Sequence, residues 1–242
     1  MENYKEALKV DQETSAKYYN SSLQRKTEQQ KLLEALLQAR SLKPLAIADI
    51  ACGGGGSTYH LAGLYPDATY TLVDRNEDAI ALARQATSHL KATCLIGDIY
   101  DLEIEDNAFD LVVCWQTLSW IEEPERAVRE LVRICKPGAR IYASSLFNVD
   151  HDVDVYSQVE DHTRPSAARG LRYVYNTYAQ ATVQRWVEGL VAEVRIHKFE
   201  IPIDLLPSGR GLGTYTARME GGPRLQFSAG MLLNWGILEL QK

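Results

Sequence analysis

A run of four glycines, Gly53 to Gly56, follows the apolar stretch IADIAC and precedes the stretch STYHLA. Glycine allows left-handed backbone dihedrals and the close approach of another group, but a run of it costs conformational entropy on folding. The stretch before the glycines is typical of a buried strand, and the stretch after them of a helix. The order of strand, glycine loop and helix predicts a turn whose backbone N–H groups face a nucleotide-like ligand.

The segments that follow repeat this alternation. Between residues 44 and 147, short β-branched runs alternate with amphipathic stretches, which predicts βα units and a parallel sheet. A chain of 242 residues can bury the core of one large α/β domain. We expect strands at residues 45–50, 69–74, 92–98 and 109–115, a turn and a strand within 136–147, and helices at 56–65, 76–90 and 123–135.

The flanking segments differ from this core in pattern. Two helical patterns precede it, and the segment after it loses periodicity and collects His, Asp, Arg and Tyr, as a loop-rich lid would. Further on, the stretch EGGP between two β-rich runs predicts a hairpin. A single domain, 1–242, therefore divides into an N-terminal helical cap (1–43), a cofactor-binding core (44–147), a lid insertion (148–175) and C-terminal strands with a hairpin insertion (176–242).

The C-terminal part has its own expected elements. We predict a helix at 177–190, strands at 193–201 and 232–240, and the hairpin between 214–219 and 224–228.

Charge and composition exclude several classes of partner. The net charge is -6 and the basic residues are dispersed, which disfavours nucleic acid as a partner. No apolar run is long enough to span a bilayer and the first residues lack a signal pattern, so we expect a cytoplasmic protein that does not bind membranes. The cysteines lie in apolar stretches without C-x-x-C or nearby histidines, which indicates buried free thiols and no metal site.

A carboxylate follows the glycine loop at the sequence spacing that is typical of a ribose-binding residue. Asp74 ends the second predicted strand, nineteen residues after Gly55. A carboxylate there can accept hydrogen bonds from both hydroxyls of a ribose. The stretch A-x-G-x-x-G, from Ala51 to Gly56, also passes as a loose dinucleotide fingerprint. An NAD(P)-dependent oxidoreductase therefore stays an alternative, although no Y-x-x-x-K motif supports it.

Five stretches in order, D-I-A-C-G-G-G, V-D, I-G-D-I, F-D-L-V-V-C-W-Q-T-L and L-V-R-I-C-K-P-G-A-R, resemble the motifs of class I S-adenosylmethionine-dependent methyltransferases. The resemblance covers roughly residues 44–147. It implies an α/β, Rossmann-like, seven-stranded sheet with helices on both faces, strand order 3-2-1-4-5-7-6 and an antiparallel last strand. It also implies S-adenosylmethionine as the cofactor and S-adenosylhomocysteine as the product.

The resemblance implies roles around the glycine loop. Asp49 would orient the ammonium group of the methionine part. Gly53 and Gly55 match two of the family's glycines and would let the loop pass close to the cofactor. Ala51 stands where the family has its first glycine, a departure that we expect to be tolerated.

It also implies roles at the next strand ends. Asp74 would bind the ribose, and Arg75 would flank the adenine. Asp98 would accept the adenine amino group, with Ile99 beside it.

The fourth strand would end beneath the methionine part of the cofactor. Cys114 and Gln116 fall there as cofactor contacts, and Tyr19 of the N-terminal segment would lie near the sulfonium. Trp115 and Trp120 would face the acceptor.

Variable segments would build the acceptor pocket. Tyr18, Arg172 and Tyr175 are the candidates for acceptor contacts there. His151 and His162 are candidate general bases, because the pKa of histidine suits proton removal near neutral pH.

These observations favour methyl transfer to an oxygen or nitrogen atom of a small-molecule acceptor by in-line displacement, which depends mainly on alignment and desolvation. The chain lacks the (N/D)-P-P-(Y/F) stretch of nucleobase-modifying relatives. A noncatalytic S-adenosylmethionine-binding protein is a further alternative. The expected partner is a diffusible small-molecule acceptor. We expect the protein to be a monomer or a homodimer.

Overall fold

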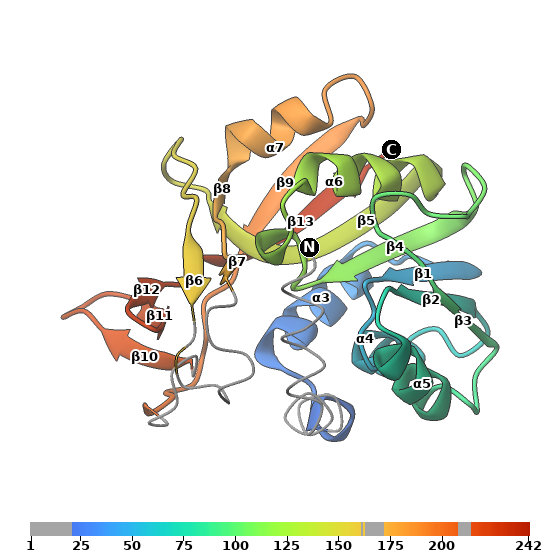
Figure 1. Ribbon diagram of the computed structural model, residues 1–242, viewed down its shortest axis with the longest axis horizontal. Helices are drawn as coiled ribbons and strands as arrows, with labels where there is room; N and C mark the ends of the chain where they lie inside the picture. Colours follow the sequence, from blue (N-terminus) through green and yellow to red (C-terminus); the bar gives the residue numbers. More distant parts are fainter. Residues whose placement is uncertain (1–20, 161, 163–171, 208–213) are drawn as a thin grey trace.

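The computed structural model describes residues 21–160, 162, 172–207 and 214–242. They form an α/β fold whose central sheet has the strand order β3-β2-β1-β4-β5-β13-β9 (Figure 1). Neighbouring strands from β3 to β5 run parallel, whereas β13 is antiparallel to both β5 and β9. The expected order with its antiparallel last strand is therefore confirmed, with β9 and β13 as the sixth and seventh strands.

The strands of the central sheet and the helices around it have the following bounds. The strands are β1 (Ala46–Ile50), β2 (Thr69–Asp74), β3 (Ala92–Ile96), β4 (Phe109–Trp115), β5 (Cys135–Asn148), β9 (Glu193–Lys198) and β13 (Trp235–Gln241), and β8 (Tyr178–Ala179) pairs with the end of β5. The described helices are α3 (Glu28–Ala39), α4 (Gly56–Leu61), α5 (Glu77–Ala86), η1 (Leu118–Trp120), α6 (Pro124–Ile134) and α7 (Gln180–Trp186).

Two hydrophobic layers cover the sheet. Alternate residues of each strand point to opposite faces, so Ala48 and Ile50 of β1 pack with α6 and α7, and Ile47 packs with α3, α4 and α5. Figure 1 shows these two sets of helices on opposite sides of the sheet. No helix in the described part of the chain is both long and apolar enough to cross a membrane. All four cysteines are buried and free, as their apolar surroundings predict.

Several elements differ from their predicted bounds at the ends. The helix after the glycine loop, predicted to reach residue 65, ends at Leu61. The residues after it form turns that are closed by backbone hydrogen bonds to residues 60 and 61. The segment expected as a helix from residue 177 begins as β8, because Tyr178 pairs with Phe147 at the end of β5, and α7 follows it. The expected final strand divides in two, with Asn234 between the parts; its side-chain amide donates to Asn148 Oδ1 at 2.8 Å.

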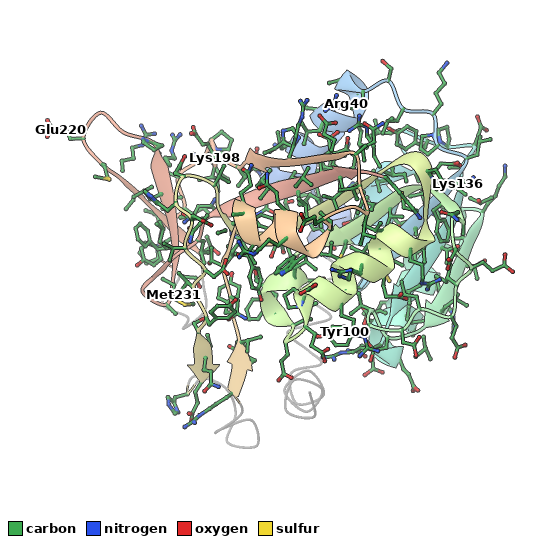
Figure 2. The ribbon with its side chains drawn as sticks, turned by 90° about the horizontal axis from the view of Figure 1, so that it is seen from above. Arg40, Tyr100, Lys136, Lys198, Glu220 and Met231 are labelled. Atoms are coloured by element: carbon green, nitrogen blue, oxygen red, sulfur yellow. The ribbon has the colours of Figure 1, made fainter. Side chains whose placement is uncertain are left out.

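A second, three-stranded sheet lies beside the central one and is called the accessory sheet here. It consists of β10 (Tyr215–Arg218), β11 (Arg224–Ser228) and β12 (Met231–Leu232), in that order and antiparallel. The hairpin predicted from EGGP is therefore present, and Glu220 and Met231, labelled in Figure 2, belong to its turn and to β12.

The insertion after β5 contains regular structure that its sequence did not predict. Strands β6 (Gln158–Glu160) and β7 (Arg172–Val174) form an antiparallel pair. The strand β7 leads to Asn176, whose backbone N–H donates to the carbonyl of Ser119 in η1 at 2.9 Å. The insertion is therefore tied to the end of β4 through η1.

A buried charge cluster fixes the far edge of the sheet to α3. Glu239 of β13, 1% exposed, accepts from Arg140 at 2.5 Å, His197 Nε2 at 2.7 Å, Arg40 Nε at 3.0 Å and the hydroxyl of Tyr142 at 3.1 Å. Arg40 is the C-cap of α3 (Figure 2). Burial acts to raise the pKa of Glu239, but the hydrogen bonds from His197, Arg40 and Tyr142 outweigh it and lower that pKa.

We expect Glu239→Gln to lower the free energy of unfolding by about 3 kcal/mol at pH 7, because it removes the buried charge that the largely buried guanidinium of Arg140 and the partly exposed one of Arg40 share. The pKa of the carboxyl is lowered in the folded protein, so its contribution is present above its ordinary value of 4.5 and is lost as the pH falls through the lower folded value. Urea unfolding at pH 7 and pH 3 measures both effects, with the exposed Glu220→Gln as the control. An equal difference between wild type and Glu239→Gln at the two pH values would contradict this account.

Candidate functional site

A cavity of about 1040 Å³ opens at the carboxyl ends of the parallel strands. The strand order reverses direction between β1 and β4, and ligands in open α/β sheets bind in the crevice at such a point. One end of the cavity is lined by the glycine loop and by the ends of β2 and β3. The other end is lined by the end of β4, by residues 199–205 and by the accessory sheet.

The glycine loop turns through a series of left-handed residues. Ala51, Gly53 and Gly55 have φ values of 57°, 53° and 80°. The N–H of Cys52 donates to the carbonyl of Val73, and the N–H of Gly55 donates to the carbonyl of Cys52, both at 3.0 Å. Only glycine adopts such dihedrals without steric cost. Gly53 and Gly55 are therefore unstrained, whereas the backbone of Ala51 is strained.

The glycines admit a protein segment as well as leaving room for a ligand. A Cβ added to Gly56 would lie 2.5 Å from Ser22 Oγ, and one added to Gly55 would lie 3.3 Å from the Cα of Ala83. Ser22 belongs to the segment before α3, and residues 21, 22 and 24–30 line the cavity. Ser22, at the end of the stretch that the resemblance placed over the cofactor, therefore lies directly on the glycine loop.

Asp49, the next-to-last residue of β1, is 1% exposed and lies behind the cavity wall, because its neighbours Ile50 and Ala51 line the cavity and Asp49 does not. Its Oδ2 accepts from the hydroxyl of Thr58 at 2.7 Å and from the backbone N–H of Thr58 at 3.2 Å. Its Oδ1 is buried and accepts no hydrogen bond from the described residues. Burial raises the pKa of Asp49 to about 7. A donor or cation brought to this oxygen would therefore be stabilised.

Asp74 lines the cavity at the end of β2 and also supports the loop. Its Oδ2 accepts from the N–H of Gly53 at 2.8 Å and its Oδ1 from the N–H of Asn76 at 2.9 Å. The backbone N–H of Arg75 also acts on this carboxylate as a hydrogen-bond donor. The two oxygens have about four lone-pair sites, so these three donors leave room for a ligand hydroxyl. Burial raises the pKa of Asp74 above its usual value, against these hydrogen bonds. Arg75 lines the cavity next to it.

Of the three residues that follow β3, two line the cavity and one points away from it. Gly97 and Ile99 line it, and a Cβ on Gly97 would lie 2.8 Å from Val73 Cγ1. Asp98 is exposed and does not line the cavity; its Oδ1 accepts from the N–H of Tyr100 at 3.0 Å. The structure thus brings Ile99, and not the carboxylate of Asp98, to the cavity.

The end of β4 likewise brings two of the candidate residues to the cavity and turns a third into the core. Trp115 and Gln116 line the cavity, and Gln116 has a left-handed φ of 52°. Cys114 does not line it, because its side chain points into the core and is fully buried. Burial raises the pKa of the Cys114 thiol to about 12, so this cysteine is a packing residue.

A polar contact couples α3 to this strand end. Gln29 of α3 is 6% exposed, and its Oε1 accepts from Ser144 Oγ at 2.7 Å and from Gln116 Nε2 at 3.3 Å. Sequence reasoning missed Gln29. The available signal was a glutamine in the first turn of a helix, next to a capping box formed by Thr27 and Gln30.

Aromatic and aliphatic side chains form the other end of the cavity. The rings of Trp120 and Tyr175 stack with their centroids 4.1 Å apart, and both line the cavity, as the sequence predicted for them. Phe199 and the aliphatic residues after it, Leu233, and Trp235 complete this end, and none of them was singled out as a site residue from the sequence. The irregular segment 199–205 has no periodicity that could reveal which side chains point inward.

The remaining candidates lie elsewhere. His151 and His162 are exposed and do not line the cavity, and His162 Nε2 lies 3.8 Å from Glu160. Arg172 is 65% exposed, and its Nε lies 3.0 Å from the same carboxylate. The insertion thus directs these charged side chains to solvent and to each other. Tyr18 and Tyr19 fall outside the described residues.

Comparison with known proteins agrees with this architecture. Residues 48–143 match a family described as "Methyltransferase domain". Ajmaline N-methyltransferase of Rauvolfia serpentina is 28% identical over 60% of this chain and 47% of its own length. Malonyl-[acyl-carrier protein] O-methyltransferase of Priestia megaterium is 30% identical over 43% of this chain and 38% of its own. The match thus spans about half or less of these relatives.

A solved structure is similar over most of the chain. A SAM-dependent methyltransferase from Methanosarcina mazei superimposes with a TM-score of 0.55 and 17% identity, covering 81% of this chain and 92% of that one. At this identity the likeness concerns the fold.

We expect Ala51→Gly to raise the free energy of unfolding by about 0.5–1 kcal/mol. The change removes the steric cost of a left-handed alanine, which exceeds the entropy lost by fixing a glycine. The matched change Ala81→Gly, at an exposed position of α5, should have the opposite sign and a cost of about 1 kcal/mol. Urea unfolding of the two variants gives both values. A loss of stability in Ala51→Gly would show that φ at this residue carries no strain.

Proposed function

Residues 48–143 of this chain form a methyltransferase domain of the class I S-adenosylmethionine-dependent family, and we propose that the protein transfers a methyl group from that cofactor to an oxygen or nitrogen atom of a small-molecule acceptor. One observation carries the proposal. A single cavity runs from the glycine loop and Asp74 to the apolar end between Trp120 and Trp235. A cofactor and a second molecule can therefore meet in it.

The residues at the loop end fit S-adenosylmethionine. The buried, unpartnered Oδ1 of Asp49 suits a cationic donor, such as the ammonium group of the methionine part. The remaining acceptor capacity of the Asp74 carboxylate suits a ribose hydroxyl. Val73 and Ile99 offer an apolar surface for the adenine, with Arg75 beside it.

The chain's own contribution to the reaction is alignment and exclusion of water. The sulfonium of the bound cofactor supplies an activated methyl group. Trp115 and Gln116 line the cavity at the end of β4, where they would orient the acceptor and keep water away. Fixing two reactants in line accounts for a large part of the rate of such displacements.

We propose that no histidine acts as a base. Neither His151 nor His162 lines the cavity, and none of the described residues at its apolar end is a histidine or a carboxylate. Transfer without a base from the protein is possible for an acceptor nitrogen with a free lone pair. It is also possible for an acceptor oxygen that loses its proton to water. The names of the relatives include both N- and O-methyltransferases, so the atom methylated is left open.

We also propose that the protein works in the cytoplasm on a diffusible acceptor, without a membrane or nucleic-acid partner. The four free, buried thiols suit a reducing compartment, and a net charge of -6 does not favour phosphate backbones.

A calorimetric titration with S-adenosylmethionine, S-adenosylhomocysteine and NAD tests the cofactor. We expect micromolar binding of the first two and none of NAD. Asp74→Ala should weaken S-adenosylhomocysteine binding about 10- to 100-fold, because it removes charge-assisted hydrogen bonds. The exposed Asp67→Ala should bind like wild type. Binding of NAD alone would overturn the proposal, and unchanged affinity in Asp74→Ala would remove the role given to that carboxylate. Mass gain of one methyl group in pooled acceptors then tests the transfer.

The affinity for S-adenosylhomocysteine should fall as the pH drops below about 7. Burial raises the pKa of Asp49 to about 7, so the free protein holds a proton there at lower pH, and that proton must leave before the carboxylate can accept from an ammonium group. The limiting slope is about tenfold per pH unit. Asp49→Asn should bind more weakly and lose this slope, whereas Asp67→Asn should keep it. A pH-independent affinity of the wild type between pH 5.5 and 8 would exclude the contact.

A further inference from the structure

The accessory sheet has polar side chains on the side that faces the apolar end of the cavity, where apolar side chains would be expected. Successive residues of β11 point to opposite sides. Phe227 faces away from the cavity and stacks on Tyr215 at a centroid distance of 5.7 Å. Gln226 and Ser228 face the cavity and line it. In a strand that closes an apolar space, these positions would ordinarily hold Val, Ile or Leu.

Gln226 turns its side-chain amide to the cavity and not to the protein. The residue is 6% exposed, lines the cavity, and makes no side-chain hydrogen bond to another described residue. Its amide is not among the buried groups without a partner, so it is open to whatever fills the cavity. Its cross-strand neighbour Thr216 has a protein partner instead, because the Thr216 hydroxyl accepts from the N–H of Leu205 at 2.9 Å. A polar group of a bound molecule can therefore pair with the Gln226 amide in place of water.

The surroundings of Gln226 limit the chemistry of that molecule. The cavity walls near it are Leu205, Leu233 and Trp235, with Trp120 and Tyr175 beyond. The charged side chains among the described lining residues come from residues 25–28 and from the end of β2, at the cofactor end. An ionic group taken into the apolar end would lose its hydration without gaining a counter-charge from the described lining residues.

We propose that the acceptor is a neutral, mainly apolar molecule, and that Gln226 selects it by a hydrogen bond to one uncharged polar group. This inference rests on the proposed methyl transfer and specifies the substrate class of the same cavity. A side-chain amide both donates and accepts, so it can pair with a hydroxyl, a carbonyl or an amide. Gln226 is thus a specificity-determining residue, carried by the accessory sheet, and takes no part in the transfer itself.

Three matched probes test this selection: naphthalene, 2-naphthol and 2-naphthoate. They share one ring system and differ in carrying no polar group, a neutral hydroxyl or a charge. Equilibrium dialysis at pH 7.5 with saturating S-adenosylhomocysteine gives their dissociation constants. In the wild type we expect 2-naphthoate to bind at least about tenfold more weakly than 2-naphthol.

The substitution Gln226→Met keeps the length of the side chain and removes its hydrogen-bonding groups. It should shift the affinity ratio of 2-naphthol to naphthalene toward naphthalene by about fivefold, the value of one hydrogen bond. Gln226→Leu should do the same, and serves if the methionine variant fails to fold. Gln184→Leu makes the same chemical change on an exposed part of α7 and should leave the ratio unchanged.

The outcomes separate the two proposals. Failure of the wild type to bind S-adenosylhomocysteine overturns the proposed function. If S-adenosylhomocysteine binds to all variants as to wild type but the ratio does not shift in Gln226→Met or Gln226→Leu, the role of Gln226 is overturned. Binding of 2-naphthoate as tight as that of 2-naphthol overturns the preference for a neutral acceptor.

Discussion

The hydrogen bond from the Gly53 N–H to the Asp74 carboxylate joins the two features on which the site depends. It ties the glycine loop after β1 to the end of β2, and it sets the side chain that faces the cofactor end of the cavity. The left-handed residues at 51, 53 and 55 make the turn narrow enough for this bond to form. The same turn brings Gly56 against Ser22, so the loop is held from the N-terminal side as well.

The core could be predicted closely from the sequence because its signals are local. The strands Thr69–Asp74 and Phe109–Trp115 have the predicted bounds, since continuous β-branched runs between turn residues leave little freedom in a buried parallel sheet. Helix ends were predicted less well. The end of α5 illustrates this, because the Thr87 hydroxyl donates back to the carbonyl of Ala83 and ends the helix within its amphipathic pattern.

The apolar end of the cavity, where we propose that the acceptor binds, could be predicted only in part, because its residues meet through tertiary structure. Trp115, Trp120 and Tyr175 were found from their place after the fourth strand or in the insertion, and they line the cavity. The same reasoning selected His151, His162 and Arg172, which are exposed. Residue type in an irregular segment does not reveal direction. Gln226 was overlooked because a polar residue in a hairpin strand is ordinary until the strand is known to face an apolar space.

The end of strand β5 joins elements that line different parts of the cavity. It pairs with β4 through Ser144, with β13 through Leu146 and with β8 through Phe147. Trp115 at the end of β4 and Trp235 at the start of β13 are the strand partners of Ser144 and Leu146, so one strand fixes the distance between these two tryptophans. The accessory sheet and residues 199–205 lie outside this ladder. Their side chains can therefore change, and with them the molecule that fits the cavity, while the strand ends stay in place.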